Sequence, residues 1–335
     1  MSSNAATADV KKKMWNYQPA RPVQVSPLFQ LPLRPVRILR WFVSGWFPFS
    51  QNLLVLSLSL ISWFFFHPAL ARCEQFRVDW IAEIWLRNLV LMSLVAGGLH
   101  WFFYISRYQG DRRHYDARPF ARNNRLFTFN DQVRDNMFWT LVSGVSVWTA
   151  YESLMMWALA NGYAPMLLWP QDFGWLLLLI FLIPIWETLY FYLIHRLIHW
   201  PPLYRRVHYL HHRNTNVGPW SGLSMHPVEH IIYLGSVLIH WIVPSSPLLI
   251  IYHLQHYTLT AATTHTGFEG LEITGKNRLP LGTFHHQMHH RFFECNYGGL
   301  EIPCDRWAGS FHDGTDESHQ AFIQNRRRKA RKTRA

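Results

Sequence analysis

The residues of this sequence best suited to chemistry are its histidines, and fifteen of the 20 lie between His195 and His290. Nine of these fifteen gather in three clusters. On a helix, residues three or four positions apart share one face, so each cluster directs several imidazole rings to one side. Neutral imidazole is a common ligand for zinc, copper, iron and nickel. The spacing therefore predicts a metal site built from HRLIH at 195–199, HYLHH at 208–212 and HHQMHH at 285–290.

The clusters supply more imidazoles than one ion of four to six positions accepts, so we predict two ions. Structural zinc sites usually include cysteine. None of the three cysteines lies within a cluster, which favours redox iron, although the spacing alone does not exclude zinc. The ligands predicted from the clusters are His195, His199, His208, His211, His212, His286, His289 and His290.

Other polar residues near the clusters have two possible roles. Glu187 precedes the first cluster by two helical turns, so its carboxylate is predicted either to orient a metal-bound histidine or to make a hydrogen bond within a helix bundle. Glu229 and Glu269 have the same two alternatives. Five further histidines are interpreted as hydrogen-bonded side chains of apolar segments. These are His67, His100, His240, His253 and His256.

The composition indicates a membrane protein. Apolar residues make up 49% of the chain and charged residues only 16%, against roughly 25% charged in soluble domains. A span requires about 20 consecutive, mostly apolar residues. Four segments meet this requirement, namely Leu53–Leu70, Ile84–Ile105, Met137–Ala160 and Gly174–Ile194.

The distribution of Lys and Arg predicts the orientation. These residues are frequent before the first apolar segment and between the second and third, and scarce in the other two loops. Cytoplasmic loops are the ones enriched in Lys and Arg, so the histidine clusters are predicted to face the cytoplasm. The net charge of +12 would also suit nucleic acid. Because the basic residues flank apolar segments, lipid headgroups are the expected partner and nucleic acid is not. We expect no cleavable signal peptide.

A fifth apolar stretch, Ile231–Ile251, is broken by PSSP and is predicted to form a re-entrant or interfacial helical pair. The expected fold is an all-α integral membrane bundle of about four spans, with a histidine-rich helical cap on the cytoplasmic side. The predicted regions are a basic cytoplasmic segment (1–50), a transmembrane bundle (51–194), a di-metal catalytic region (195–312) and a basic, disordered tail (313–335).

The clusters also resemble the histidine boxes of the membrane fatty acid hydroxylase and sterol desaturase superfamily. Between Ile185 and His312, four blocks are similar in order and spacing to sterol C-5 desaturases: WETLYFYLIHRLIHWPPLYRRVHYLHH, MHPVEH, HTGFEG and FHHQMHHRFFECNYGGLEIPCDRWAGSF. The resemblance implies that the eight clustered histidines bind two iron ions, with O2 as co-substrate. It adds His226 and His265 as ligands. One departure is Ala261, where a hydroxylase-type partner of His265 is expected; His230 is an alternative partner.

The resemblance further implies a membrane-bound, non-haem di-iron oxidoreductase that hydroxylates or desaturates an unactivated C–H bond of a lipid. The sequence contains no haem-attachment motif, flavin fingerprint or iron–sulfur cysteine set. The electrons are therefore expected from a ferredoxin or from a b-type cytochrome with its reductase. One alternative is a sterol desaturase acting on a ring C–H bond.

An alternative from another class is a histidine-rich metal transporter. Transporters place their ligands near the bilayer midplane on broken helices, whereas these clusters follow the fourth apolar segment on one side. The choice between hydroxylation and desaturation, the lipid, and the membrane (endoplasmic reticulum or bacterial inner membrane) stay open at this stage.

Overall fold

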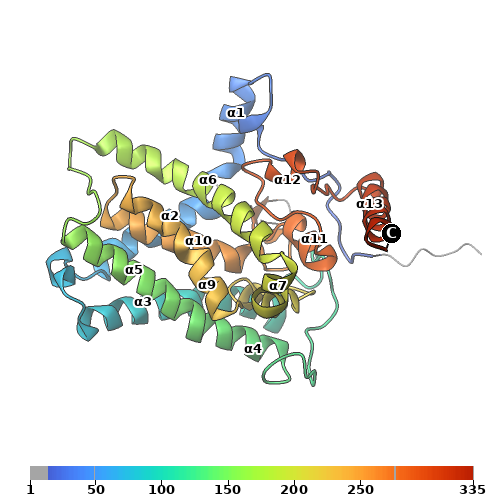
Figure 1. Ribbon diagram of the computed structural model, residues 1–335, viewed down its shortest axis with the longest axis horizontal. Coiled ribbons are helices and arrows are strands. Elements are labelled where there is room, and N and C mark those ends of the chain that lie inside the picture. The colour runs from blue at the N-terminus through green and yellow to red at the C-terminus, as the bar shows by residue number, and fades with distance from the viewer. Residues whose placement is uncertain (1–13, 49, 275–276, 335) are drawn as a thin grey trace, which may run out of the picture.

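The computed structural model describes residues 14–48, 50–274 and 277–334 (Figure 1). The described chain is mostly helical, as predicted, and its only sheet pairs β1 (Gly270–Thr274) with β2 (Asn277–Pro280) in antiparallel fashion. Lys11, Lys12 and Lys13, which contribute to the predicted orientation, lie outside the described residues. The long helices of the bundle are α2 (Gln51–Phe65), α3 (Val78–His100), α5 (Val145–Ala160), α6 (Phe173–Ile198) and α10 (Pro247–Thr264).

Shorter helices surround the ends of this bundle. Two π-helical segments extend long helices: η4 (Trp101–Ile105) follows α3, and η5 (Trp139–Gly144) precedes α5. A third, η6 (Tyr204–His208), follows α7. The remaining α-helices are α1 (Pro35–Trp41), α4 (Gln132–Phe138), α7 (Pro201–Leu203), α8 (Tyr209–His212), α9 (Pro227–Leu234), α11 (Phe284–Phe292), α12 (Cys304–Trp307) and α13 (Asp316–Arg334).

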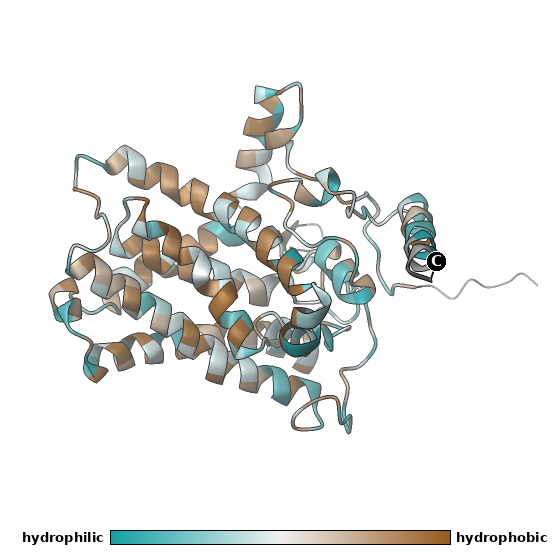
Figure 2. Ribbon diagram, in the orientation of Figure 1, coloured by the Kyte–Doolittle hydropathy of each residue, from teal (hydrophilic) through white to brown (hydrophobic). Residues whose placement is uncertain are grey.

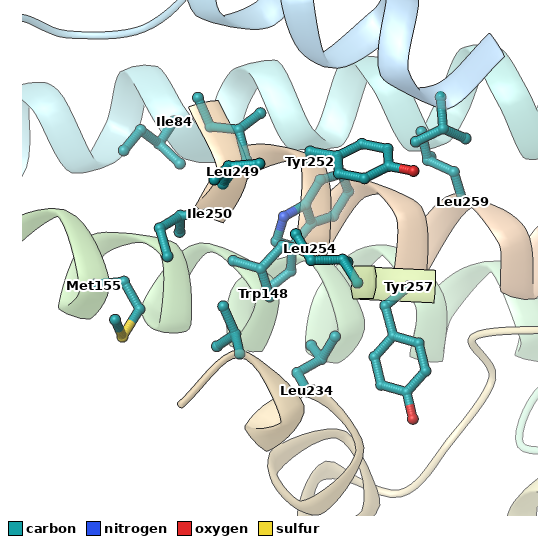
Figure 3. Packing of buried hydrophobic residues seen from close by; sticks show 14 of the residues in the cluster. Ile84, Trp148, Met155, Leu234, Leu249, Ile250, Tyr252, Leu254, Tyr257 and Leu259 are labelled. Carbon is teal, nitrogen blue, oxygen red and sulfur yellow. The ribbon is translucent and has the colours of Figure 1, made fainter. Parts of the chain in front are cut away.

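Helix α10 lies at the centre of the bundle and packs against α2, α3, α5 and α6. Every side chain from Leu249 to Thr263 is buried, and Ile84, Trp148 and Leu234 from three other helices surround it (Figure 3). The predicted break at PSSP is confirmed, because Ser246 caps the start of α10. Of the two expected arrangements, re-entrant or interfacial, the packing of α10 among four other helices agrees better with the re-entrant one, and its position relative to a membrane stays a prediction.

Two helices are long and apolar enough to cross a membrane, namely Val78–Ile105 and Phe173–Ile198. A third candidate is the pair Pro35–Trp46 and Gln51–Phe65, which is bent by 59° at its break. Figure 2 shows long hydrophobic stretches along these helices. By length and composition, the described residues thus provide two spans, or three if the bent pair is one span. The count of four remains a prediction.

The end of the chain differs from the expected disordered tail, because α13 is helical from Asp316 to Arg334. Most residues of this segment, such as Arg, Lys, Gln and Ala, have high helix propensity. Asp316 and Glu317 lie in its first turn, where acidic side chains interact favourably with the helix dipole.

A buried ion pair joins two long helices of the bundle. Arg87 of α3 lies 2.5 Å from Glu152 of α5, and Asn88 also hydrogen-bonds this carboxylate at 3.3 Å. Both charged side chains are almost completely buried. Charged groups within an apolar bundle are tolerated when they are paired, so this pair explains how α5 accommodates an acidic residue.

We expect Glu152→Ala to lower the free energy of unfolding by about 3–5 kcal/mol, because it leaves the Arg87 guanidinium buried without a partner. The double variant Arg87→Met, Glu152→Leu should recover most of this loss, since no unpaired charge remains. Denaturation of the detergent-solubilised protein measures both. The control is Glu83→Ala, which removes an exposed pair with Arg72 and should cost at most about 1 kcal/mol. Equal effects of Glu152→Ala and Glu83→Ala would contradict the expectation.

Candidate metal centre

The histidine clusters meet at one end of α6. His195 lies in the last turn of α6 and His199 is its C-cap residue. Pro201 and Pro202 then begin α7, and the chain turns back through η6 and α8. Proline disfavours continuation of a helix from the residue before it, so the WPP sequence ends α6 at this point. The turn places the second histidine cluster, on η6 and α8, beside the first cluster. The third cluster, on α11, packs against both.

The nine histidines that meet here form two groups, and within each group the ligand atoms all lie within 4.8 Å of one another. Among these nine, histidines four positions apart on a helix fall in the same group, whereas the adjacent histidines of the doublets 211–212 and 289–290 fall in different groups. Neighbouring residues of a helix point about 100° apart, so one doublet serves two sites. The first group is His195, His199, His208, His212 and His289; the second is His211, His265, His286 and His290.

Two predicted or alternative ligands lie outside both groups. His226 is the N-cap residue of α9, and its Nδ1 accepts a hydrogen bond from the backbone N–H of Val228 at 3.2 Å. His230 contacts Ser143 Oγ at 2.9 Å and the carbonyl oxygen of Leu223 at 3.0 Å. The structure therefore brings together nine of the ten histidines named in advance as ligands, and metal binding by these nine stays a prediction.

Backbone carbonyls fix the tautomer of several of these rings. A carbonyl oxygen only accepts, so a histidine Nδ1 that contacts one must carry the proton. The Nε2 atom of a neutral ring then has a free lone pair. The Nδ1 contacts are His195 to Tyr297 (2.5 Å), His289 to Cys295 (2.6 Å), His265 to Ala261 (2.7 Å) and His290 to Asn214 (3.0 Å).

The Nε2 atoms of each group face one another at 3.0–3.2 Å. Examples are His195 with His208 at 3.0 Å in the first group and His265 with His290 at 3.1 Å in the second. In the second group both rings have their proton on Nδ1, so the facing lone pairs repel and cannot form a hydrogen bond. A cation between them removes the repulsion. Metal–imidazole bonds are about 2.0–2.1 Å long, which places ligands at right angles about 3 Å apart, as observed.

The loop after α11 holds two of these carbonyls, those of Cys295 and Tyr297, and lies within the last of the four blocks quoted from the sequence. Asn296 adopts a left-handed conformation with φ of 57°, which costs free energy in most residues other than glycine, although Asn tolerates it better. Its side chain stabilises the turn by donating to the carbonyls of His285 and His312. Asp305, from the DRW block, accepts hydrogen bonds from the N–H groups of Tyr297 and Gly298 at 2.9 and 2.7 Å.

Burial keeps the imidazoles neutral. Eight of the nine are buried and His199 is half-buried. Burial lowers the pKa of His208 to about 3 and that of His211 to about 4, because the charged form loses its hydration. Neutral rings are the form that binds metal. Both histidines are therefore in the metal-binding form at neutral pH.

The three carboxylates considered in advance have different partners. Glu229 Oε1 lies 2.7 Å from His208 Nδ1, and burial raises the pKa of this carboxyl to about 8. This contact orients a histidine of the first group, as one of the two alternatives predicts. Glu187 instead contacts His256 Nδ1 at 2.5 Å, which is the bundle hydrogen bond of the other alternative. Glu269 pairs with Arg113 at 2.8 Å.

A cavity of about 190 Å³ adjoins both groups. His195, His208, His211, His265 and His286 line it near the metal centre, and residues of α2, α6 and α10 form much of the remaining wall. Of the polar residues in this second part, Glu187 and the hydrogen-bonded His256 are predicted from the sequence, whereas Asn52 and Tyr257 are not. Their only signal is that polar side chains interrupt apolar segments.

Comparison with known proteins supports the resemblance. The fatty acid hydroxylase family matches residues 179–310. A Delta(7)-sterol 5(6)-desaturase of Gibberella zeae is 33% identical over 144 residues, which are 42% of this chain and 44% of the relative. The Delta(7)-sterol 5(6)-desaturase of Saccharomyces cerevisiae is 33% identical over 125 residues, 37% of this chain and 33% of the relative. A Delta(7)-sterol-C5(6)-desaturase of Nicotiana tabacum is 26% identical over 254 residues, 70% of this chain and 84% of the relative.

The chain thus spans less than half the length of the first two of these relatives. No solved structure matches it significantly. The matches confirm the similarity to the fatty acid hydroxylase and sterol desaturase superfamily that the histidine blocks predict.

We expect the chelator-treated protein to lose stability as the pH falls from 6.5 to 4.5. Burial lowers the pKa of His208 to about 3 and of His211 and His230 to about 4, so below 6.5 the unfolded chain binds protons that the folded chain does not. Each such histidine contributes up to about 1.4 kcal/mol per pH unit. Glu229, with its raised pKa, acts in the opposite direction but is a single group. Constant or rising stability in denaturation curves across this range would contradict the expectation.

We expect Glu229→Ala to weaken metal binding by about 10–100-fold, because His208 loses the acceptor that orients its ring. Glu229→Gln retains an acceptor oxygen and should recover part of the affinity. Metal per chain, measured by mass spectrometry after dialysis against graded chelator, gives the comparison. The control is His226→Ala, which removes a histidine outside both groups and should leave metal content unchanged. Loss of metal from His226→Ala, with retention in Glu229→Ala, would reverse the assignment.

Proposed function

We propose that this chain, which is similar to the fatty acid hydroxylase and sterol desaturase superfamily, is a membrane-bound oxidoreductase that hydroxylates or desaturates a lipid with O2. The observation that carries the proposal is the pair of histidine groups beside a cavity lined by helices of the apolar bundle. The family match and the relatives named as sterol desaturases support it.

Two metal ions are the cofactors in this proposal, one held by each histidine group, and iron is the metal that the similarity favours. Iron would supply the activation of O2 and the oxidation of an unactivated C–H bond. The chain's own residues hold the imidazoles neutral and fix their orientation through the carbonyls of Tyr297, Cys295 and Asn214. They also exclude water, because eight of the nine rings are buried.

The lipid would reach the site from the bilayer, since α2, α6 and α10 contribute to the cavity wall. Electrons would come from a separate ferredoxin, or from a b-type cytochrome with its reductase. His199 is the one half-buried histidine of the nine, and Arg196, Arg205 and Arg206 are exposed nearby in the sequence. A basic surface of this kind suits an acidic electron carrier, because complementary charges accelerate association.

We also propose the finer topology. The bundle would have four spans, with the histidine groups on the cytoplasmic side of the endoplasmic reticulum or a bacterial inner membrane. The excess of Lys and Arg in alternate loops supports this orientation. The catalytic region would be residues 195–312, and it includes α10 of the bundle.

A second candidate reaction is desaturation of a sterol ring C–H bond. The names of the relatives favour it, because three of them are sterol 5(6)-desaturases from two fungi and a plant. Both reactions use the same metal centre, so the product decides between them.

Lipid mass spectrometry tests the proposal. Cells expressing the intact chain should accumulate a lipid with one added oxygen, for a hydroxylase, or with two hydrogens fewer, for a desaturase. The double variant His289→Ala, His290→Ala removes one ligand from each group and should reduce the product at least about 100-fold. His226→Ala, at equal protein level, is the matched control and should retain the product. An identical lipid profile for all three chains, in a host that supplies sterols and electron donors, would refute the proposal.

A further inference from the structure

The part of the cavity wall remote from the histidine groups carries buried polar side chains within the apolar bundle. Asn52 of α2, Glu187 of α6 and His256 of α10 line this part and are all buried. In the part of the chain that the structure describes, none of the three hydrogen-bonds to a histidine of either group. Polar groups are costly to bury in a membrane protein, and their presence there usually marks a function.

These three side chains form a chain of hydrogen bonds, and its geometry determines how many protons the side chains of His256 and Glu187 carry together. Asn52 Nδ2 donates to the carbonyl oxygen of Trp46 at 2.8 Å, so Asn52 Oδ1 faces His256 Nε2 at 2.9 Å. That oxygen only accepts, and His256 Nε2 therefore carries a proton. His256 Nδ1 then shares one further proton with Glu187 Oε2 at 2.5 Å. Whichever atom holds this proton, the pair of Glu187 and His256 has no net charge.

Two polar atoms of this wall have no hydrogen-bond partner among the described residues. They are Glu187 Oε1 and the hydroxyl of Tyr257, and both residues line the cavity. His253 Nε2 lies 3.7 Å from Glu187 Oε1, but it is already bonded to Ser236 Oγ at 3.0 Å. In Figure 3 the hydroxyl of Tyr257 points away from the other labelled side chains. The residues that carry this free acceptor and this free hydroxyl thus line the same cavity.

The other two carboxylates of the cavity, Glu301 and Glu229, already have partners on at least one oxygen. Glu301 accepts from the indole N–H of Trp46 at 3.3 Å and from the hydroxyl of Thr188 at 3.1 Å, one on each oxygen. Glu229 also has an oxygen without a partner, but its other oxygen orients His208, so this carboxylate belongs to the metal centre. Glu187 is therefore the carboxylate that offers a free oxygen away from the metal centre.

We propose that Glu187 and Tyr257 bind an uncharged hydroxyl group of the lipid, an inference that rests on the proposed function. The ligand hydroxyl donates to Glu187 Oε1, and its oxygen accepts from the hydroxyl of Tyr257. A charged headgroup does not fit, because the pair of Glu187 and His256 is neutral and would leave that charge uncompensated. Glu187 precedes His195 by eight residues of α6, or about 12 Å along the helix. The bound hydroxyl would therefore lie away from the metal centre, on the order of two turns back along α6.

Photoaffinity competition tests the inference without relying on activity. The purified full-length chain in lipid nanodiscs is labelled with hexadecanol carrying a mid-chain diazirine. Competition by hexadecanol is then compared with competition by hexadecyl methyl ether, which can accept a hydrogen bond but cannot donate one. In the wild-type chain the alcohol should compete about tenfold better than the ether, the scale of one hydrogen bond to a carboxylate. Equal competition would overturn the inference with no variant needed.

Three variants test which residues give rise to the preference for the alcohol over the ether. Glu187→Met should abolish it, whereas Glu187→Gln, which keeps an acceptor oxygen, should retain much of it. Tyr257→Phe should weaken alcohol and ether alike, because both ligands lose the same donor. The matched control Glu83→Gln changes an exposed carboxylate that bonds Arg72, and should keep the tenfold preference. A preference that survives in Glu187→Met would overturn the inference.

The two proposals fail separately. If the wild-type chain modifies a lipid but treats alcohol and ether alike, the hydroxyl site is wrong and the oxidoreductase stands. If it prefers the alcohol but modifies no lipid, the hydroxyl site is supported as a binding site and the oxidation chemistry is wrong.

Discussion

The constraint on which this structure depends is the repulsion between imidazole lone pairs held at hydrogen-bond distance. Carbonyl oxygens occupy the Nδ1 side of at least four rings, so the Nε2 lone pairs have only one another to face. A cation is the partner that turns this repulsion into attraction. The surrounding elements serve this arrangement: the prolines that end α6, the left-handed Asn296 that presents two carbonyls, and Asp305, which holds the same turn.

Much of the site could be predicted from the sequence because helical spacing is local information. The spacing of four residues between His195 and His199, and between His286 and His290, predicts that each pair shares one face of a helix. This prediction needs no knowledge of tertiary contacts. The partition of the doublets 211–212 and 289–290 between two groups could not be predicted, since it depends on where the other helices lie. Likewise, His256 contacts Glu187 across 69 residues of chain, and no local pattern announces that contact.

The fold was less predictable where apolar content alone had to choose between lipid and protein as the environment. A helix that faces lipid and a helix that is buried inside the protein have similar apolar sequences. Helix α10 is buried among four others, whereas α3 and α6 expose apolar side chains such as Leu94 and Leu193. The basic C-terminal segment shows a similar ambiguity, because a strongly charged composition is compatible with disorder and also with helix.

The partition of the doublets makes the two sites mechanically inseparable. His211 and His212 share one short helix, as do His289 and His290, so the backbone that sets one site's geometry also sets the other's. Binding of a metal ion at either site would fix the positions of α8 and α11. Binding of the second ion would then cost less conformational entropy. Occupancy of the two positions should thus be cooperative, with singly loaded protein scarce at any metal concentration.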